Sequence, residues 1–417
     1  MTLPVHAASS PDVLSAVNAL WEPSAIPDPY GRYEAVRGLS RDGLLFLPEW
    51  NAWFATGYAA NSAVLRSPAA LSGQWLAGVP QGAVSDGMQL LRHMMLWHNG
   101  LPHARLRGLV QKAFTPRVVE EQRDLVRSLL ADLLRDAQKR DSAGETEEVE
   151  IVAALAHPLP ARVIMKMLGL QGGDEEKFLR WSGSVAELLG GADQSPALLA
   201  RIDADAREMR SFFRDLADEL RLHPQPGLLS ALAAAQDGGQ QLSGDELLSN
   251  AVLLLTAGHE TTSNLIPGGL LELSRQPGAW AALVHDPRHP GVADELLRVV
   301  APVQFDGRQL GADLQVGDQT LKAGQGVQLI LAAANRDPQV FADPACLDWD
   351  RPGSSRHLAF AAGPHYCLGA SLARLEITEV FAALAGRFPN LKVTQPHPPY
   401  KPNPVLRGPQ ELHVRLG

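Results

Sequence analysis

A single cysteine, Cys367, lies in a segment whose composition suits a metal ligand. The segment Phe360–Gly369 places glycines on both sides of the thiol, and a stretch with helical character, Ala370–Phe388, follows it. Glycines allow the backbone to approach a flat group closely, and the N-terminal amides of the following helix would favour the thiolate over the thiol. The ordinary alternative is a buried cysteine that acts as a small hydrophobic side chain. The cysteine alone leaves that alternative open.

A second set of chemically capable residues lies in an apolar stretch upstream. The segment Ala257–Thr261 reads Ala-Gly-His-Glu-Thr. A glycine costs about 1 kcal/mol in a helix interior, and a buried carboxylate is costly unless it has a partner. The flanking residues, such as Ala251–Leu255, are too apolar for an exposed helix. We therefore expect the acid and the hydroxyl to be buried; the alternative is a polar stripe on a surface helix.

The elements that must position these residues are mainly helical. A capping-box pattern, Ser243-Gly-Asp-Glu246, opens a helix that we expect to run to about Arg275, some 45 Å at about 1.5 Å per residue, with a kink at Pro267. Helical periodicity also holds from about 102 to 235, with polar breaks at 138–147, 171–174 and 190–195. The sequence therefore predicts a mainly α fold with small β-sheets.

The remaining elements are short. Leu44–Leu47 and Ala52–Gly57 predict a hairpin, and weak periodicity predicts a long loop over Ser72–Gln89. Short strands are expected within 307–326, 392–394 and 411–415. Residues 1–24 are expected to form an N-terminal arm with a short helix, and residues 25–417 a single domain.

Composition excludes several classes of function. The chain has 417 residues and a net charge of −9, which argues against generic nucleic-acid binding. Its two cysteines leave no disulfide framework, which suits a reducing cytoplasm. The longest apolar runs are far shorter than the ~20 residues that span a membrane. The sequence predicts a cytoplasmic protein that binds neither membrane nor nucleic acid.

The cysteine segment resembles the haem-binding signature of the cytochromes P450, Phe-Gly-x-Gly-x-His/Arg-x-Cys-x-Gly. Ala361 departs from the pattern, since the family usually has glycine there, and its methyl should shift the loop slightly. The resemblance implies a P450 fold in which haem b lies between a long distal helix and the proximal cysteine loop, with Cys367 as the axial iron ligand. The residues that match the signature are Phe360, Gly363, His365, Cys367 and Gly369.

By the same resemblance the distal helix would activate oxygen. Ala257 and Gly258 would leave room for dioxygen, Thr261 would hydrogen-bond oxygen bound at the iron or a water, and Glu260 would relay protons. The hydroxyl of Thr261 can also bond the Ala257 carbonyl one turn back. His259, beside the acid, is expected to face away from the iron.

Further matches imply a scaffold and a frame for the two haem propionates. Glu295 and Arg298 resemble the family's buried ion pair, which Arg351 would join. Removing one partner would leave a buried charge. The four residues assigned to the propionates are His103, Arg107, Arg308 and His365.

The implied function is that of a haem-thiolate monooxygenase. It would act as a monomer and insert one oxygen atom from O2 into a small-molecule substrate that is mostly apolar and of medium or large size. Electrons would come from a separate ferredoxin or flavodoxin-type donor with its reductase, docking at a basic face for which Lys112 and Arg374 are candidates. A peroxide-driven peroxygenase and a non-catalytic haem-binding or sensor protein are the alternatives. Substrate-pocket candidates are Met94, Met95, Val303, Phe305 and Val405, within the segments 73–97, 183–199, 303–305 and 402–406. The alternative for Met94 and Met95 is that they are ordinary core residues.

Overall fold

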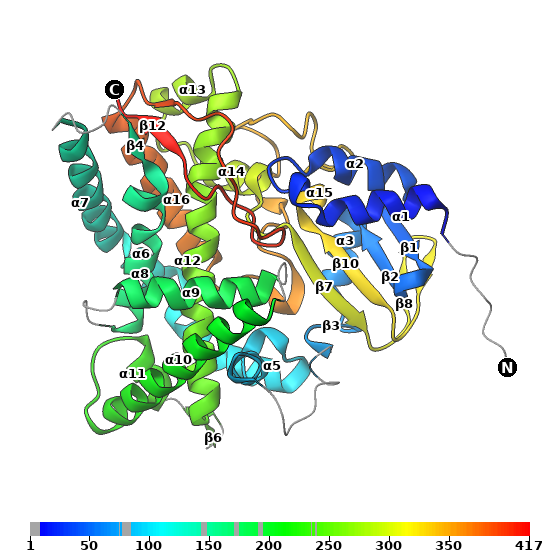
Figure 1. The fold of residues 1–417 in the computed structure, drawn as a ribbon, viewed down its shortest axis with the longest axis horizontal. Coiled ribbons are helices and arrows are strands. Elements are labelled where there is room, and N and C mark those ends of the chain that lie inside the picture. The colour runs from blue at the N-terminus through cyan, green and yellow to red at the C-terminus, as the bar shows by residue number, and fades with distance from the viewer. Residues whose placement is uncertain are drawn as a thin grey trace.

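The protein has a helical body beside a smaller region built on a β-sheet, as Figure 1 shows. The computed structural model describes residues 9–74, 76, 85–142, 148–170, 175–190, 195–234, 236–237 and 240–417. The helices are α1 (Pro11–Asn18), α2 (Tyr30–Leu39), α3 (Tyr58–Arg66), α4 (Asp86–Arg92), α5 (Gly100–Val110), α6 (Pro116–Glu120), α7 (Arg123–Ser142), α8 (Pro158–Leu168), α9 (Glu175–Gly190), α10 (Pro196–Leu222), α11 (Leu228–Ala234), α12 (Gly244–Arg275), α13 (Ala279–His285), α14 (Val292–Val300), α15 (Leu331–Ala334) and α16 (Ala370–Arg387). The predicted mainly α fold is confirmed.

The largest sheet has the strand order β1-β2-β10-β7-β3. The hairpin predicted at its edge is confirmed: β1 and β2 pair antiparallel, with Leu44 opposite Ala55. On the other side β2 pairs in parallel with β10, whose Gly326 lies opposite Ala52. The strands are β1 (Leu44–Leu47), β2 (Ala52–Ala55), β3 (Ala70–Leu71), β4 (Val149–Glu150), β5 (Gln236–Asp237), β6 (Gln240–Gln241), β7 (Phe305–Leu310), β8 (Leu314–Val316), β9 (Gln319–Leu321), β10 (Gly326–Ile330), β11 (Lys392–Val393) and β12 (His413–Arg415).

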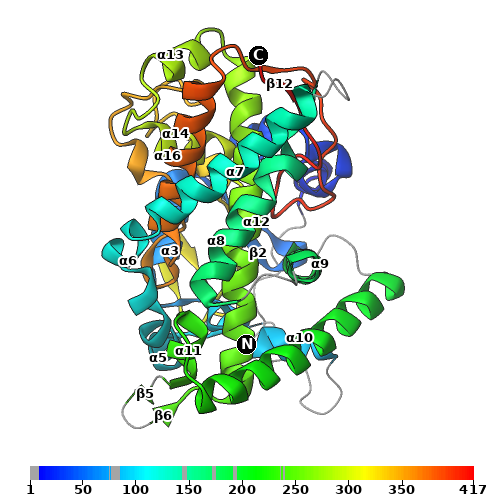
Figure 2. The same ribbon diagram turned by 90° about the vertical axis from the view of Figure 1, so that its left-hand side faces the viewer.

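Helix α12 is the axis of the helical body. It spans 32 residues, and Figures 1 and 2 show it crossing the molecule with α16 beside it. The predicted capping box opens it: the Ser243 hydroxyl accepts from the Glu246 amide at 3.1 Å, and the Glu246 carboxylate accepts from the Ser243 amide at 2.9 Å. Both apolar and polar residues along the helix are buried. The helix continues through Pro267, and the kink expected there stays a prediction.

Some boundaries predicted from sequence are wrong. The loop expected over Ser72–Gln89 ends earlier, because α4 begins at Asp86, where the Ser85 hydroxyl accepts from the Met88 amide at 3.4 Å and caps the helix. The break expected from residue 138 also begins too early, since α7 continues to Ser142. The rest of that break, 143–147, lies outside the described residues, as do 75 and 77–84 of the loop and the breaks at 171–174 and 191–194.

The described part of the N-terminal arm packs against the sheet. Its predicted short helix is α1, and Val17 and Leu20 are buried in one cluster with Phe54 and Phe305. Residues 1–8 lie outside the described residues, and the boundary at residue 24 stays a prediction. None of the helices in the described ranges has the length and apolar character that crossing a bilayer requires.

Candidate functional site

A cavity of about 820 Å³ lies between α12 and the segment that carries the cysteine. Its wall is mainly apolar, and most of the residues predicted from sequence meet in it although they come from distant parts of the chain. Those that line it are His103, Arg107, Ala257, Gly258, Glu260, Thr261, Arg308, Phe360, His365, Cys367 and Gly369, together with Met95, Val303, Phe305 and Val405.

Two predicted residues do not line the described part of this cavity. Met94 is fully buried in the main hydrophobic core, so its prediction as a pocket residue is wrong. Its neighbour Met95 faces the cavity, because the short 3-10 helix Met95–Trp97 turns the chain after Met94. Gly363 instead packs the cysteine loop onto α3: its φ is +69°, and a Cβ there would lie 2.3 Å from the Leu65 carbonyl oxygen.

The cysteine loop is closed by its own backbone. The Cys367 amide donates to the Phe360 carbonyl at 2.9 Å, and the Phe360 ring is buried under the Arg374 guanidinium. Ala361 has a φ of +55°, a conformation that costs a non-glycine residue of order 1 kcal/mol. The structure thus gives a physical reason why glycine suits this position.

The surroundings of the Cys367 thiol act on its pKa in both directions. Burial raises the pKa, whereas a hydrogen bond from the Gly369 amide and the charges of Arg107 and Arg374 lower it; burial dominates. The Gly369 amide therefore favours the thiolate, as expected, but burial outweighs its effect on the pKa. A coordinated metal deprotonates a thiol outright, so the Cys367 thiolate would form when a metal binds.

On the opposite wall, Thr261 bonds to its own helix. Its hydroxyl donates to the Ala257 carbonyl at 3.0 Å, as the sequence suggested. Gly258 also has a packing role: a Cβ there would lie 3.1 Å from the Ile164 side chain, so the glycine lets α8 approach α12 closely. It lines the cavity as well, and the room that it would leave for dioxygen stays a prediction.

Glu260 is buried and paired. Its Oε2 accepts from Lys401 Nζ at 3.0 Å, and its Oε1 lies 3.6 Å from His259 Nδ1. Burial works to raise the pKa of Glu260, but the charges of Lys401 and His259 outweigh it and hold the pKa below its ordinary value. His259 faces away from the cavity, as expected, with Nδ1 3.0 Å from the Ser182 hydroxyl.

Cationic and imidazole side chains gather at another part of the wall. The His103 and His365 rings stack with centroids 4.2 Å apart, and Arg107 donates to the Tyr366 carbonyl at 2.7 Å. Burial, then the charge of Arg308, lowers the pKa of His365 to about 3, and burial also lowers that of His103. Both imidazoles are therefore neutral hydrogen-bonding groups, and Arg308, paired with Asp306, and Arg107 carry the positive charge.

The predicted scaffold ion pair is present and fully buried. Arg298 donates to both carboxylate oxygens of Glu295, at 2.7 and 2.8 Å, and Arg351 donates to Glu295 Oε1 at 2.8 Å. The remaining guanidinium donors bind backbone carbonyls, including those of Asn335, Pro344 and Cys346. The group has one excess positive charge, which the dipoles of these carbonyls stabilise, and the α14 end is tied to the segment before the cysteine loop.

One of the cavity residues that the sequence analysis missed is an acid. Glu376 on α16 is buried, lines the cavity, and has no hydrogen-bond partner for either carboxyl oxygen among the described residues. Burial raises its pKa to about 8, although the nearby Thr262 hydroxyl acts in the opposite direction. The sequence signal was weak, because the same helix also contains Arg374 and a second acid, Glu379. Trp97 also lines the cavity.

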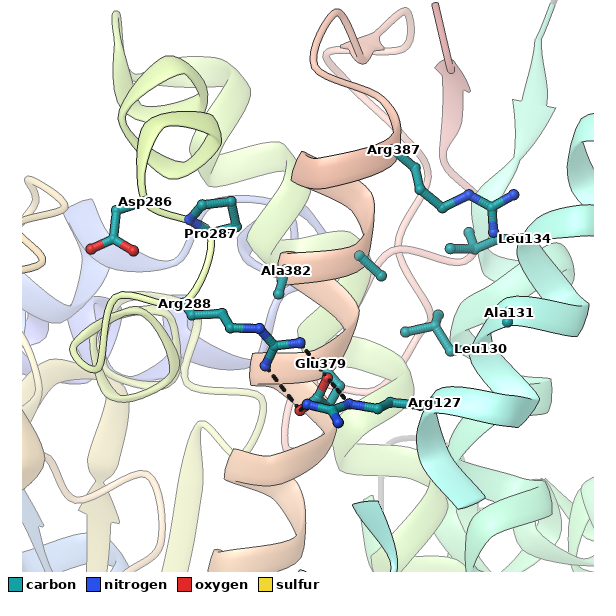
Figure 3. Close-up of a pocket in the computed structure, with 11 residues that line it drawn as sticks. Arg127, Leu130, Ala131, Leu134, Asp286, Pro287, Arg288, Glu379, Ala382 and Arg387 are labelled. Atoms are coloured by element: carbon teal, nitrogen blue, oxygen red, sulfur yellow. Dashed lines mark hydrogen bonds and ion pairs between the residues drawn. The ribbon is translucent and has the colours of Figure 1, made fainter. Parts of the chain in front are cut away.

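A second cleft, of about 550 Å³, contains none of the residues predicted for the site. Figure 3 shows Arg127 from α7 and Arg288 converging on Glu379 of α16, and Arg123 joins them. Burial works to raise the pKa of Glu379, but hydrogen bonds from Arg288, Arg127 and Arg123 lower it to about 2. This cluster joins three elements and leaves the first cavity as the candidate active site.

The first cavity fits the haem that the sequence resemblance implies. Its mainly apolar wall suits a porphyrin, Cys367 offers one soft ligand, and Arg107, Arg308 and two neutral imidazoles offer donors for propionates. Gly369 lines the cavity, and a Cβ there would meet nothing within 4 Å, so the glycine keeps this wall clear for a flat group.

Comparisons with known proteins agree with this geometry. The family model described as "Cytochrome P450" matches residues 290–416. The cytochrome P450 monooxygenase PikC of Streptomyces venezuelae is 34% identical over 98% of this chain and 95% of its own length. The structure of ligand-free CYP164A2 of Mycobacterium smegmatis has a TM-score of 0.84 and 37% identity, covering 96% of this chain and 99% of that one. CYP109E1 of Bacillus megaterium, solved in complex with testosterone, has a TM-score of 0.81 and 26% identity over 95% and 100% of the two chains. The fold, the cysteine cavity and relatives that match nearly the whole chain show that it belongs to the cytochrome P450 family.

Proposed function

We propose that this haem-thiolate monooxygenase oxygenates a medium or large, mostly apolar molecule in the cavity between Cys367 and Thr261. Haem b, once bound, supplies the iron at which dioxygen is activated by two electrons. One oxygen atom enters the substrate and the other leaves as water, so the reaction consumes protons that the chain must deliver. The observation that carries the proposal is the meeting of a thiol and an acid–hydroxyl pair in one cavity.

The chain's own residues divide the work between the two walls. Cys367 would ligate the iron from the loop side, and Arg107, Arg308, His103 and His365 would hold the propionates. The Thr261 hydroxyl, which now donates to a helix carbonyl, can turn its hydrogen bond to a group in the cavity. Glu260 is the acid beside it.

The substrate class follows from the cavity and from one relative. The wall is mainly apolar, with Met95, Phe305 and Val405 among its residues. CYP109E1 was solved with testosterone, a rigid and mostly apolar molecule of suitable size. We take testosterone as the first probe.

The electron donor is proposed to be a separate ferredoxin or flavodoxin-type protein. Tyr366, next to Cys367, is 39% exposed. Of the two candidate cations, Lys112 is exposed, whereas Arg374 is partly buried and bound to Asp294 at 2.7 Å. Lys112 is therefore the better docking candidate. Reduction by a surrogate ferredoxin should slow as salt increases and in Lys112→Glu; reduction that is insensitive to both would count against this face.

The proposed site is complete within one chain, since both walls and the cationic residues belong to it. We therefore propose that a monomer is active. Sedimentation of the active protein as a single chain would support this, and activity confined to a dimer fraction would oppose it.

The decisive experiment joins a spectrum with a variant. The reduced protein with carbon monoxide should give the red-shifted Soret band of a thiolate-ligated haem, and Cys367→Ser should lose it. With a surrogate ferredoxin system and testosterone, Thr261→Ala should lose about 100-fold or more in product formation and release hydrogen peroxide instead. Thr261→Ser, which keeps the hydroxyl, is the control. Equal product from hydrogen peroxide alone in wild type and Thr261→Ala would favour a peroxygenase.

A further inference from the structure

The acid beside Thr261 is held by a residue from the far end of the chain. Lys401 reaches Glu260 Oε2 at 3.0 Å while its own side chain stays partly exposed. The other titratable groups that act on Glu260 are His259 on the same helix and His157 at the start of α8. Burial, the charge of Lys401 and that of His259 lower the pKa of His157 to about 4, and burial lowers that of His259. Lys401 is therefore the permanent positive charge in this group.

Lys401 belongs to a folded-back segment, residues 399–409, which we call the C-terminal loop. The Lys401 amide donates to the Gly408 carbonyl at 3.1 Å, and the Gln410 amide donates to the Pro399 carbonyl at 2.8 Å. These bonds close the base of the loop, and the lysine stands at that base.

The tip of the same loop forms part of the cavity wall. Val405 and Leu406 line the cavity, and the Asn403 side chain braces them by accepting from both of their amides, at 3.0 and 2.8 Å. Asn403 also donates to the Ala186 carbonyl at 3.1 Å. Gly190 permits this contact, because a Cβ there would lie 2.1 Å from the Asn403 amide nitrogen.

One short loop thus touches the substrate space at its tip and the acid at its base. We propose that Lys401 is a positioning residue that keeps Glu260 charged and correctly placed, and that the loop tip sets the position of Lys401. A change in the cavity that moves Val405 or Leu406 then alters the hydrogen bond to the acid. The inference rests on the proposed role of Glu260 and assigns a further residue to it.

The test follows the Glu260 carboxyl by infrared difference spectroscopy over a pH titration of the haem-loaded protein. The band is assigned by its loss in Glu260→Gln. Without Lys401 the remaining large influence is burial, which favours the neutral acid, so Lys401→Met should shift the protonation midpoint to higher pH. Lys401→Arg should restore it. Asn403→Ala should shift it in the same direction by a smaller amount.

The matched control is Lys322→Met, which removes a lysine that also binds a carboxylate, Asp313, at 2.9 Å but lies on the surface away from the cavity. It should leave the Glu260 midpoint unchanged. An unchanged Glu260 midpoint in Lys401→Met overturns the proposal. If the midpoint shifts in Lys401→Met but not in Asn403→Ala, the loop tip does not set the position of Lys401.

A second readout separates this inference from the proposed function. Lys401→Met should keep the thiolate Soret band with carbon monoxide, while a larger share of NADH electrons drawn through the surrogate ferredoxin is recovered as hydrogen peroxide. A normal band with an unchanged Glu260 midpoint removes the role of Lys401 and leaves the monooxygenase standing. A missing band in wild type removes the monooxygenase itself.

Discussion

Glu376 is an acid that its surroundings keep neutral. It is buried on α16, its carboxyl oxygens lack partners among the described residues, and its pKa is raised to about 8. Because the folded protein holds this proton to a higher pH than the unfolded chain does, stability falls as pH rises from the ordinary carboxyl range toward 8. The cavity therefore contains a carboxylic acid that can donate a hydrogen bond at neutral pH.

Glu376→Gln should reveal this penalty. The glutamine cannot ionise. The free energy of unfolding of the variant, relative to that of wild type, should therefore rise by about 2–5 kcal/mol between pH 5 and pH 8. Urea unfolding followed by circular dichroism at several pH values measures the difference. A constant difference across that range would show that Glu376 is not neutral in the folded protein.

At the residue scale, the sequence predicted which side chains take part in the chemistry better than it predicted which residues surround them. Cys367, Glu260 and Thr261 could be found because their types and spacing match a motif. The lysine that binds Glu260 lies 141 positions away, and no local pattern links the two. Met94 and Met95 are both buried and share almost the same sequence context, but only Met95 lines the cavity, because one turn of 3-10 helix separates their directions.

Among the elements, α14 is anchored by charges rather than by apolar contact alone. Glu295 and Arg298 have no exposed side-chain surface, and Arg351 completes the group from a segment just upstream of the cysteine loop. An intact buried ion pair with full hydrogen bonding has little net effect on the free energy of unfolding. Removing one partner destabilises the protein strongly, because the other charge stays buried without a counter-charge. The arrangement fixes the position from which the cysteine loop starts.

Glu295→Gln should destabilise the protein by about 3–5 kcal/mol, because it leaves two guanidinium groups without a counter-charge in the interior. Thermal and urea unfolding of the haem-loaded protein measure the loss. Glu22→Gln, which breaks an exposed pair with Arg32, is the control and should cost less than about 1 kcal/mol. Equal losses in both variants would refute a special role for the buried pair.

Element boundaries were predictable where a local signal exists. The capping box placed the start of α12, and the hairpin was indicated by two short, mainly apolar segments a few residues apart. Helix α7 extends beyond its predicted end, since polar residues such as Gln138 and Lys139 are also good helix formers. The parallel pairing of β2 with β10 had no local signal, because their residues are far apart in sequence.

At the scale of the whole molecule, the cavity lies between the α12 wall and the wall formed by the cysteine loop. The contacts of the apolar core do not join these two walls across the cavity. Residues from α5, α12, β7, α16 and the C-terminal loop surround it. A group that binds all of them in the folded state, and few of them in the unfolded chain, must stabilise the fold by linkage.

Removal of haem should therefore lower the free energy of unfolding by about 4 kcal/mol for each thousandfold excess of haem over its dissociation constant. Unfolding of the haem-free and haem-loaded protein at equal concentration measures this difference. Cys367→Ser should narrow the difference, whereas Lys322→Met should not. Equal stability of the two forms would mean that the folded protein binds haem no more tightly than the unfolded chain does.

The parallel pairing of β2 with β10 also has a consequence for biosynthesis. Ala52 lies opposite Gly326 in this sheet, so an early-made strand waits for a partner that leaves the ribosome only after most of the chain has been translated. The strand β2 is meanwhile an open edge beside its hairpin partner, exposed to wrong pairing. Cys367 emerges later still, and the cofactor can be captured only when synthesis is nearly complete. Haem can therefore be captured no earlier than the last stage of translation.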